Sequence, residues 1–250
     1  MQQQRILLMS SSRHGTQGYL EHAERQLHTV LQREARHVLF IPYAAVSFSY
    51  QHYEDMVSPV FARLGYTLAS IHHHDTSLRQ AVLQADAIAV GGGNTFALLA
   101  RLYQHNLLDA IRERVLAGIP YIGWSAGSNI ACPSIRTTND MPIVAPPSLS
   151  ALGLLPFQLN PHFIRGKPAG HNGESREERL DEFLQINAPE QLLALPEGSA
   201  LYSDGTDGSV LGADGALHFQ ARGQVQHLEQ GTRFALSRII GPACSSPQRT

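Results

Sequence analysis

The sequence has little cysteine and no long apolar run. Cys132 and Cys244 are the two cysteines among 250 residues, and neither belongs to a Cys-x-x-Cys pair. Such usage excludes a disulfide framework and a cysteine-rich zinc site, and it suits a reducing compartment. The apolar stretch near the start, Ile6 to Met9, is too short for a signal peptide, and no run is long enough to span a bilayer. We therefore expect a cytoplasmic protein without a membrane segment.

The chain also lacks an excess of charge of either sign. Its 19 Lys and Arg residues nearly balance its 21 Asp and Glu residues, and no run of like charges occurs. Nucleic-acid and membrane-surface binders carry clustered basic residues, so we expect neither partner but a small molecule instead. A chain of 250 residues with 43% hydrophobic composition can form one large domain. We predict a single domain over residues 1–240 and a disordered tail over residues 241–250, where periodicity ends.

Short apolar runs alternate with longer segments of helical period through the first half of the chain. The predicted strands are Ile6–Met9, Val38–Ile41, Thr67–Ile71, Ala87–Val90 and Tyr121–Ile122. The predicted helices between them are Tyr19–Arg33, Tyr53–Leu64, Leu78–Gln84, Thr95–Tyr103 and Leu107–Ala117. This alternation predicts an α/β fold with helices around a parallel sheet. Later in the chain we predict a helix over Arg176–Gln185 and, over the glycine-punctuated segment Leu201–Phe234, antiparallel strands that complete the sheet.

Five residues, Gly123-Trp-Ser-Ala-Gly127, follow the strand predicted at Tyr121–Ile122 and match the Gly-x-Ser-x-Gly pattern of a nucleophile elbow. Such a turn from strand to helix exposes the serine hydroxyl. Ligands of an open parallel sheet bind beyond the carboxyl ends of its strands, where both Ser125 and the cluster Gly91-Gly-Gly-Asn-Thr95 fall. The cluster lacks the spacing and lysine of phosphate-binding loops. It can form a tight turn capped by Asn94 and, without excluding that turn, it can supply an oxyanion hole together with the N–H of Ala126.

A serine nucleophile needs a histidine base and a carboxylate that orients the imidazole. Among thirteen histidines, His162 follows a predicted strand on a loop, as Ser125 does, although a packed or surface histidine is the alternative. Asp140 would complete the order Ser, Asp, His, or it closes an Asx turn. Three consecutive residues, His72 to His74, would alternate between the faces of a strand or its exit loop. We therefore interpret them as a solvated cluster and predict no metal site.

The segment Tyr121–Val144 closely resembles the nucleophile block of the dipeptidase E family, the aspartyl dipeptidases among the serine peptidases. Five further segments resemble family segments in the same order: Phe40–Ala44, Val90–Phe96, Asn160–Phe163, Gly170–Arg176 and Leu195–Gly198. The resemblance implies a three-layer α/β/α parallel-sheet domain like that of class I glutamine amidotransferases. It implies an exopeptidase that hydrolyses dipeptides with an N-terminal aspartate, without metal or organic cofactor. We expect a monomer or homodimer.

The resemblance also implies roles for individual residues. It makes Ser125 the nucleophile and His162 the general base, with Gly93 and Ala126 as oxyanion-hole donors. Asp140 matches the position usually given as the orienting carboxylate and is preferred here. Glu197, in Leu195-Pro-Glu-Gly198, matches a second acid proposed for that role and is the reserve.

Selection of an N-terminal aspartate needs a cation for the side-chain carboxylate. Arg176 is the candidate, because Ser175 and Glu178 predict a capping box that puts Arg176 at the first helical position, where the helix dipole disfavours positive charge. A solvated surface arginine is the alternative. His171, in the same matched segment, is a further candidate for the substrate pocket, and Ser175 stands where the family commonly has threonine.

Other functions fit parts of the pattern. A cyanophycinase-like exopeptidase acting on β-aspartyl linkages shares the elbow, and a catalytically silent small-molecule-binding protein could share the scaffold. The retention of Ser125, His162 and both acids argues against the silent protein. An α/β-hydrolase esterase is disfavoured because its histidine falls near the end of the domain, whereas His162 does not.

Overall fold

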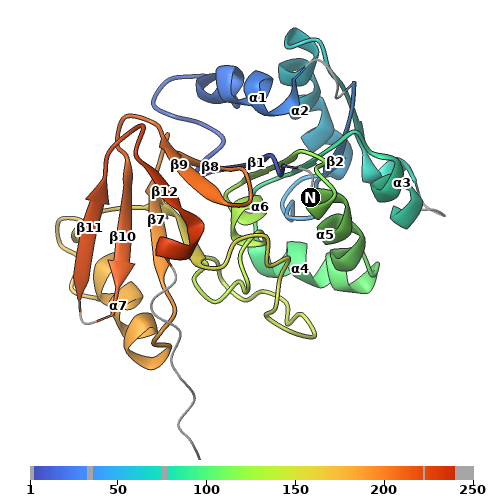
Figure 1. Cartoon of the computed structure of the whole chain (residues 1–250). Helices are drawn as coiled ribbons and strands as arrows, with labels where there is room; N and C mark the ends of the chain where they lie inside the picture. Colours follow the sequence, from blue (N-terminus) through green and yellow to red (C-terminus); the bar gives the residue numbers. More distant parts are fainter. Residues whose placement is uncertain (1–2, 33–35, 75–77, 222, 240–250) are drawn as a thin grey trace, which may run out of the picture.

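The computed structural model describes residues 3–32, 36–74, 78–221 and 223–239 (Figure 1). Its larger sheet has eight strands in the spatial order β12-β9-β8-β1-β5-β4-β2-β3. Five strands are parallel, as predicted: β1 (Ile6–Met9), β5 (Tyr121–Trp124), β4 (Ala87–Val90), β2 (His37–Ile41) and β3 (Thr67–Ser70). Three antiparallel strands extend the sheet beyond β1: β8 (Ala200–Ser203), β9 (Asp207–Leu211) and β12 (Arg233–Ala235).

The apolar runs of the four inner parallel strands, β1, β2, β4 and β5, are buried on both faces of this sheet. In β1, Ile6 and Leu8 belong to the core cluster on one face, and Leu7 and Met9 belong to the cluster on the other. This division follows from the two-residue period of a strand. A run of four apolar residues is therefore what a strand covered by helices on both sides requires.

Helices cover both faces, so the predicted three-layer α/β/α arrangement is confirmed (Figure 1). One face carries α1 (Glu24–Leu31) and α2 (Tyr50–Arg63). The other carries α3 (Leu78–Gln84), α4 (Thr95–Gln104), α5 (Leu108–Leu116) and the short α6 (Ala126–Asn129). The described residues also form three 3-10 helices: η1 (Glu21–Ala23), η2 (Ile71–His73) and η3 (Leu236–Arg238). Asn94 caps α4 as predicted, because its Oδ1 accepts the N–H of Ala97 at 3.0 Å.

A second, four-stranded sheet stands beside the first and was not predicted (Figure 1). Its order is β11-β10-β7-β6, from β6 (Gln158–Phe163), β7 (Leu192–Pro196), β10 (Ala216–Gln220) and β11 (Gln224–Leu228). Helix α7 (Arg176–Ile186) buries Leu180 and Leu184 against Leu217 and Phe219 of β10. The prediction that all strands of Leu201–Phe234 join the parallel sheet was therefore wrong for β10 and β11, because the apolar face of α7 gives them a core of their own.

Two further sequence predictions concern the C-terminal tail and membrane-spanning segments. The predicted tail over residues 241–250 lies outside the described residues. Among the helices within the described ranges, none has both the length and the apolar character that a membrane crossing needs.

Candidate active site

The strand-to-helix turn predicted at Ser125 is present. Ser125 lies between β5 and α6 with φ 52° and ψ −113°, a backbone conformation that a residue other than glycine rarely adopts. Its N–H donates to the carbonyl oxygen of Met9 at 3.0 Å. A Cβ on Gly127 would lie 2.1 Å from the carbonyl oxygen of Val90, so glycine is required for this close approach to β4. The turn thus holds a half-buried serine at the carboxyl end of β5.

His162 lies within strand β6, whereas the sequence predicted a loop after a strand. The pairing of β6 with β7 shifts its register around this residue, and the φ of His162 is 53°. A bulge of this kind redirects a side chain from the regular alternation of the strand. The N–H of His162 donates to Ser10 Oγ at 2.8 Å. Since Ser125 is bonded to Met9 and His162 to Ser10, the last residue of β1 and the residue after it fix both backbones.

The imidazole of His162 contacts Glu197. His162 Nδ1 lies 2.9 Å from Glu197 Oε1, and the two side chains are 40% and 59% exposed. A carboxylate at Nδ1 fixes the ring so that Nε2 is the nitrogen that can accept a proton from a nucleophile. Glu197 follows β7, and the next strand, β8, belongs to the larger sheet.

Asp140 has other partners. Its Oδ2 accepts the N–H of Thr95 at 2.7 Å and the hydroxyl of Thr95 at 2.5 Å, and it lies 3.2 Å from the hydroxyl of Thr138. Thr95 is the first residue of α4, where the helix dipole favours an anion. Asp140 therefore anchors the helix that begins directly after the glycine cluster, while Glu197 is the acid bonded to the imidazole.

The glycine cluster lies against Ser125. A Cβ on Gly92 would lie 3.0 Å from the Cβ of Ser125. Gly93 has φ +132°, and a Cβ there would lie 2.3 Å from the carbonyl oxygen of Ala44, so no other residue fits without distortion. Within the described part of the chain, the N–H groups of Gly93 and Ala126 donate to no backbone or side-chain acceptor. Gly93 lies just before α4 and Ala126 directly follows Ser125, the two positions at which the sequence predicts oxyanion-hole donors.

A cluster of three aromatic residues, Tyr19, Tyr53 and Trp124, supports the glycine turn through Tyr53. The hydroxyl of Tyr53 donates to the carbonyl of Gly92 at 3.0 Å, and Trp124 Nε1 donates to the hydroxyls of Tyr53 and Tyr19 at 3.0 and 2.9 Å. Burial raises the pKa of Tyr53 well above its ordinary value and also raises the pKa of Tyr19. Both hydroxyls therefore keep their protons at neutral pH and serve as hydrogen-bond donors.

Arg176 is the first residue of α7, and the predicted capping box is present. The hydroxyl of Ser175 accepts the N–H of Glu178 at 3.2 Å, and the Glu178 carboxylate accepts the N–H of Ser175 at 2.6 Å. Burial lowers the pKa of Arg176, the neighbouring Arg179 adds to this effect, and Asp140 opposes it. An arginine nevertheless stays protonated in a protein, so the position carries a partly buried cation.

One amide connects Arg176 to the segment of His162. The guanidinium of Arg176 donates to Asn139 Oδ1, and Asn139 Nδ2 donates to the carbonyl of Pro161 at 2.8 Å. Beside this contact is a pocket of about 210 Å³ lined by Ile164, Gly166, Pro168, His171, Glu174, Ser175, Arg176 and Arg179. The two substrate-binding residues predicted from the sequence, Arg176 and His171, thus line the same pocket.

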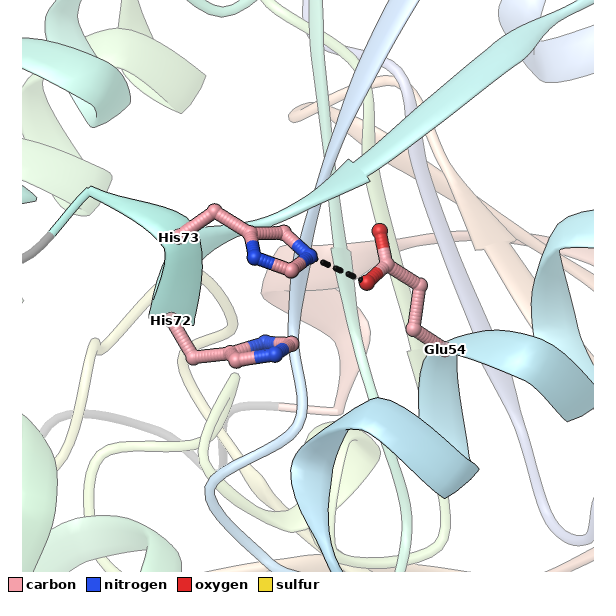
Figure 2. Close-up of side chains that lie close together, drawn as sticks. All are labelled: Glu54, His72 and His73. Carbon is pink, nitrogen blue, oxygen red and sulfur yellow. Dashed lines mark hydrogen bonds and ion pairs between the residues drawn. The ribbon is translucent and has the colours of Figure 1, made fainter.

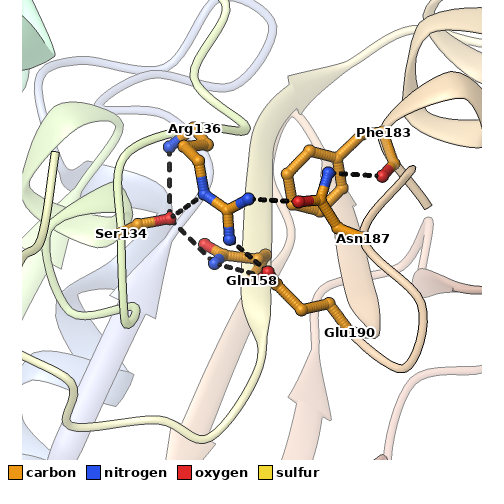
Figure 3. A network of polar contacts seen from close by, with 6 residues as sticks. All are labelled: Ser134, Arg136, Gln158, Phe183, Asn187 and Glu190. Atoms are coloured by element: carbon orange, nitrogen blue, oxygen red, sulfur yellow. Dashed lines mark hydrogen bonds and ion pairs between the residues drawn. The ribbon is translucent and has the colours of Figure 1, made fainter. Parts of the chain in front are cut away.

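A second polar network joins the segment after the nucleophile to the smaller sheet (Figure 3). The guanidinium of Arg136 bonds to the Glu190 carboxylate and donates to Asn187 Oδ1 at 2.5 Å, and it lies over the Phe183 ring at 5.0 Å. Gln158 of β6 donates to the same glutamate at 2.9 Å. The network fixes the loop that carries Asp140 against the sheet that carries His162.

Three residues in contact with the site were missed by sequence reasoning: Ser10, Tyr53 and Asn139. Ser10 follows an apolar strand and Tyr53 lies in a helical pattern, and neither position carries a local motif. Asn139 was quoted only as part of the matched block. The position of Ser10 at the carboxyl end of a parallel strand is the one signal that could have identified it.

The chain is similar over most of its length to known peptidases. The model of peptidase family S51 matches residues 6–211. The chain is 49% identical to peptidase E of Pasteurella multocida over 230 residues, and this alignment covers 92% of this chain and 98% of that protein. It is 52% identical over 208 residues to peptidase E of Haemophilus influenzae, with 83% and 95% covered. A crystal structure of a peptidase from an acI-B1 Actinobacterium has the same fold, with a TM-score of 0.68 at 20% identity and 93% and 97% of the chains covered.

Proposed function

The chain belongs to peptidase family S51, and we propose that it is a serine dipeptidase that hydrolyses dipeptides with an N-terminal aspartate. One observation carries this proposal more than any other. Ser125, with its positive φ, and His162, bonded to Glu197, have their backbones fixed by the adjacent residues Met9 and Ser10. In this proposal Ser125 is the nucleophile, His162 the base and Glu197 the carboxylate that orients it, and the end of β1 supports the first two residues from both sheets.

The reaction is an acyl transfer in two steps. His162 Nε2 accepts the proton of Ser125 Oγ as that oxygen attacks the carbonyl carbon that follows the aspartate. The N–H groups of Gly93 and Ala126 stabilise the oxyanion of the tetrahedral intermediate. His162 then returns the proton to the leaving amine. Water, activated by the same imidazole, hydrolyses the aspartyl ester on Ser125.

We assign the orienting role to Glu197 in place of Asp140. Glu197 Oε1 lies within hydrogen-bonding distance of His162 Nδ1, while the Asp140 carboxylate bonds to Thr95 and Thr138. In this assignment Asp140 keeps the first turn of α4, and with it the oxyanion-hole segment, in place. Its charge also lies near Arg176, whose pKa it affects.

Arg176 is the proposed partner of the substrate's aspartate side chain. Its guanidinium is partly buried and is linked through Asn139 to the residue before His162. Arginine binds a carboxylate through two parallel hydrogen bonds, which gives both affinity and geometric selection. His171 lines the same pocket and is the second proposed contact.

We further propose that the enzyme acts as an exopeptidase in the cytoplasm, as a monomer or homodimer, on small substrates and without a cofactor for its chemistry. The free, buried Cys132 fits a reducing compartment. Every group that the acyl transfer needs is a side chain or backbone amide of the chain itself.

The experiment is a substrate panel: Asp-Leu, Leu-Leu, N-acetyl-Asp-Leu and β-linked Asp-Leu, with Ser125→Ala as the blank. We expect cleavage of Asp-Leu alone and its loss in the variant. Cleavage of only the β-linked peptide would establish the cyanophycinase-like activity instead. Cleavage of no peptide by protein with native circular dichroism would favour a silent binding protein.

A further inference from the structure

Two histidines and one glutamate meet at the far edge of the larger sheet (Figure 2). The sequence interpretation, in which His72 to His74 alternate between faces, was wrong for His72 and His73. The residues Ile71–His73 form the 3-10 helix η2 and not an extended strand, so the two rings lie side by side with their centroids 4.0 Å apart. Glu54 of α2 faces them from across the gap between the helix and the strand exit.

The three side chains bring their ligand atoms within 4.8 Å of one another. Glu54 Oε2 lies 2.7 Å from His73 Nε2. The Glu54 side chain is 10% exposed, and that of His73 is 49% exposed. The Glu54 carboxyl group therefore lies at the buried end of the cluster and His73 at its solvent-exposed end.

Ser70 orients two of these three side chains. Its N–H donates to Glu54 Oε1 at 2.8 Å, and its hydroxyl lies 2.6 Å from His72 Nδ1. Ser70 itself is fully buried at the end of β3. Metal-binding carboxylates and imidazoles are held in this way, each by a hydrogen bond from the atom that does not face the metal.

We propose that Glu54, His72 and His73 bind a divalent transition metal ion of the Zn²⁺ class. Glu54 Oε2, His72 Nε2 and His73 Nε2 are the three ligand atoms. Two histidines and one carboxylate form a set that Zn²⁺ accepts, with water in the fourth position. Hard ions such as Mg²⁺ prefer oxygen ligands and are disfavoured by the two imidazoles.

Metal binding requires the three side chains to adjust. Tetrahedral Zn²⁺ with bonds of about 2.0–2.1 Å places its ligand atoms about 3.3 Å apart. Glu54 Oε2 and His73 Nε2, at 2.7 Å, must therefore move apart by about 0.6 Å, and a pair at the 4.8 Å limit of the cluster must close by about 1.5 Å. His73 is half exposed and can move outward, while Ser70 holds the buried ligands.

The site is independent of peptide hydrolysis. Strand β3 lies three places from β5, which leads to Ser125, in the order of the larger sheet. A metal here would join the start of α2 to the exit of the edge strand β3. We infer a stabilising role, since an ion that binds the folded chain and not the unfolded chain favours folding.

The test is Zn²⁺ titration of the chelator-treated full chain by isothermal calorimetry, with thermal unfolding in parallel. We expect one site that is lost in His73→Gln and in Glu54→Gln and retained in His74→Ala, the adjacent control. At a free Zn²⁺ concentration of about 100 times Kd, the unfolding equilibrium constant of the wild type should fall about 100-fold. His73 is half exposed, so its variant should fold, and circular dichroism without metal checks this point.

Two results would overturn the proposal. One is the absence of Zn²⁺ binding to the wild type above the level of His73→Gln. The other is loss of the site in His74→Ala with no change in the two ligand variants. Binding of Co²⁺ with the visible spectrum of a four-coordinate ion, absent in Glu54→Gln, would support the ligand set by a readout that needs no peptidase activity.

Discussion

Replacement of Glu197 by glutamine tests which acid orients the base. The substitution keeps the size of the side chain but removes the charge and one acceptor from the contact with His162 Nδ1, which is 2.9 Å long. In a buried triad, the change from carboxylate to amide lowers kcat by about 10⁴-fold. Glu197 is 59% exposed and His162 40% exposed, so water can replace part of the interaction. We therefore expect a smaller loss, about 10²-fold in kcat, or about 2.7 kcal/mol.

The matched control is Asp140→Asn. An asparagine can still accept a hydrogen bond from Thr95, and it loses the favourable charge at the start of α4, worth about 0.3–1 kcal/mol of stability. We expect kcat within about tenfold of the wild type and a small decrease in Tm. Initial rates on Asp-Leu at saturating and limiting substrate separate kcat from KM. A 10³-fold loss in Asp140→Asn with less than a tenfold loss in Glu197→Gln, both correctly folded, would refute the assignment.

Three other perturbations examine the oxyanion hole, the substrate pocket and the core. Gly93→Ala puts a Cβ 2.3 Å from the carbonyl oxygen of Ala44 and so displaces one oxyanion-hole donor. We expect kcat to fall by about 10²–10³-fold. An unchanged kcat in the folded variant would exclude Gly93 as a donor to the oxyanion. Arg176→Gln leaves the substrate carboxylate unpaired, at a cost of about 2–5 kcal/mol, so kcat/KM for Asp-Leu should drop at least about 30-fold. A wild-type value of kcat/KM would show that Arg176 does not bind the substrate carboxylate. Burial raises the pKa of Cys132 to about 12, so the folded chain holds the thiol proton more tightly than the unfolded chain does. The stabilisation that results is fully present below pH 9 and is lost as the pH rises toward 12. Between pH 8 and 10 the free energy of unfolding from urea titration should fall by about 1.4 kcal/mol more in the wild type than in Cys132→Ala, and equal slopes would contradict this account.

The features predicted correctly from the sequence depend on local physics. The inner parallel strands are apolar runs covered on both faces, and Asn94 and Ser175 cap their helices through contacts three residues away. The turn at Ser125 follows from glycines that permit close backbone approach. Such features need only neighbouring residues to be decided.

The features that were missed depend on distant pairing. The second sheet forms because β6 and β7 pair across about thirty residues and α7 covers them. The bulge at His162 depends on that pairing, and the Ser10 hydroxyl, which accepts the His162 N–H, donates to Leu195, 185 residues away in the chain. The preference for Asp140 over Glu197 came from family resemblance, while the contact with His162 comes from the turn between β7 and β8. The periodicity of a sequence contains no information about such meetings.

The division of the site between two sheets has a consequence for how the enzyme loses activity. Ser125 follows a strand of the larger sheet, His162 lies in the smaller sheet, and Glu197 lies on the connection that passes from one to the other. A slight separation of the sheets would leave every strand and helix intact yet part the proposed nucleophile from its proposed base. The rate of peptide hydrolysis should therefore report a change in the packing of the two sheets that a measurement of secondary structure would not detect.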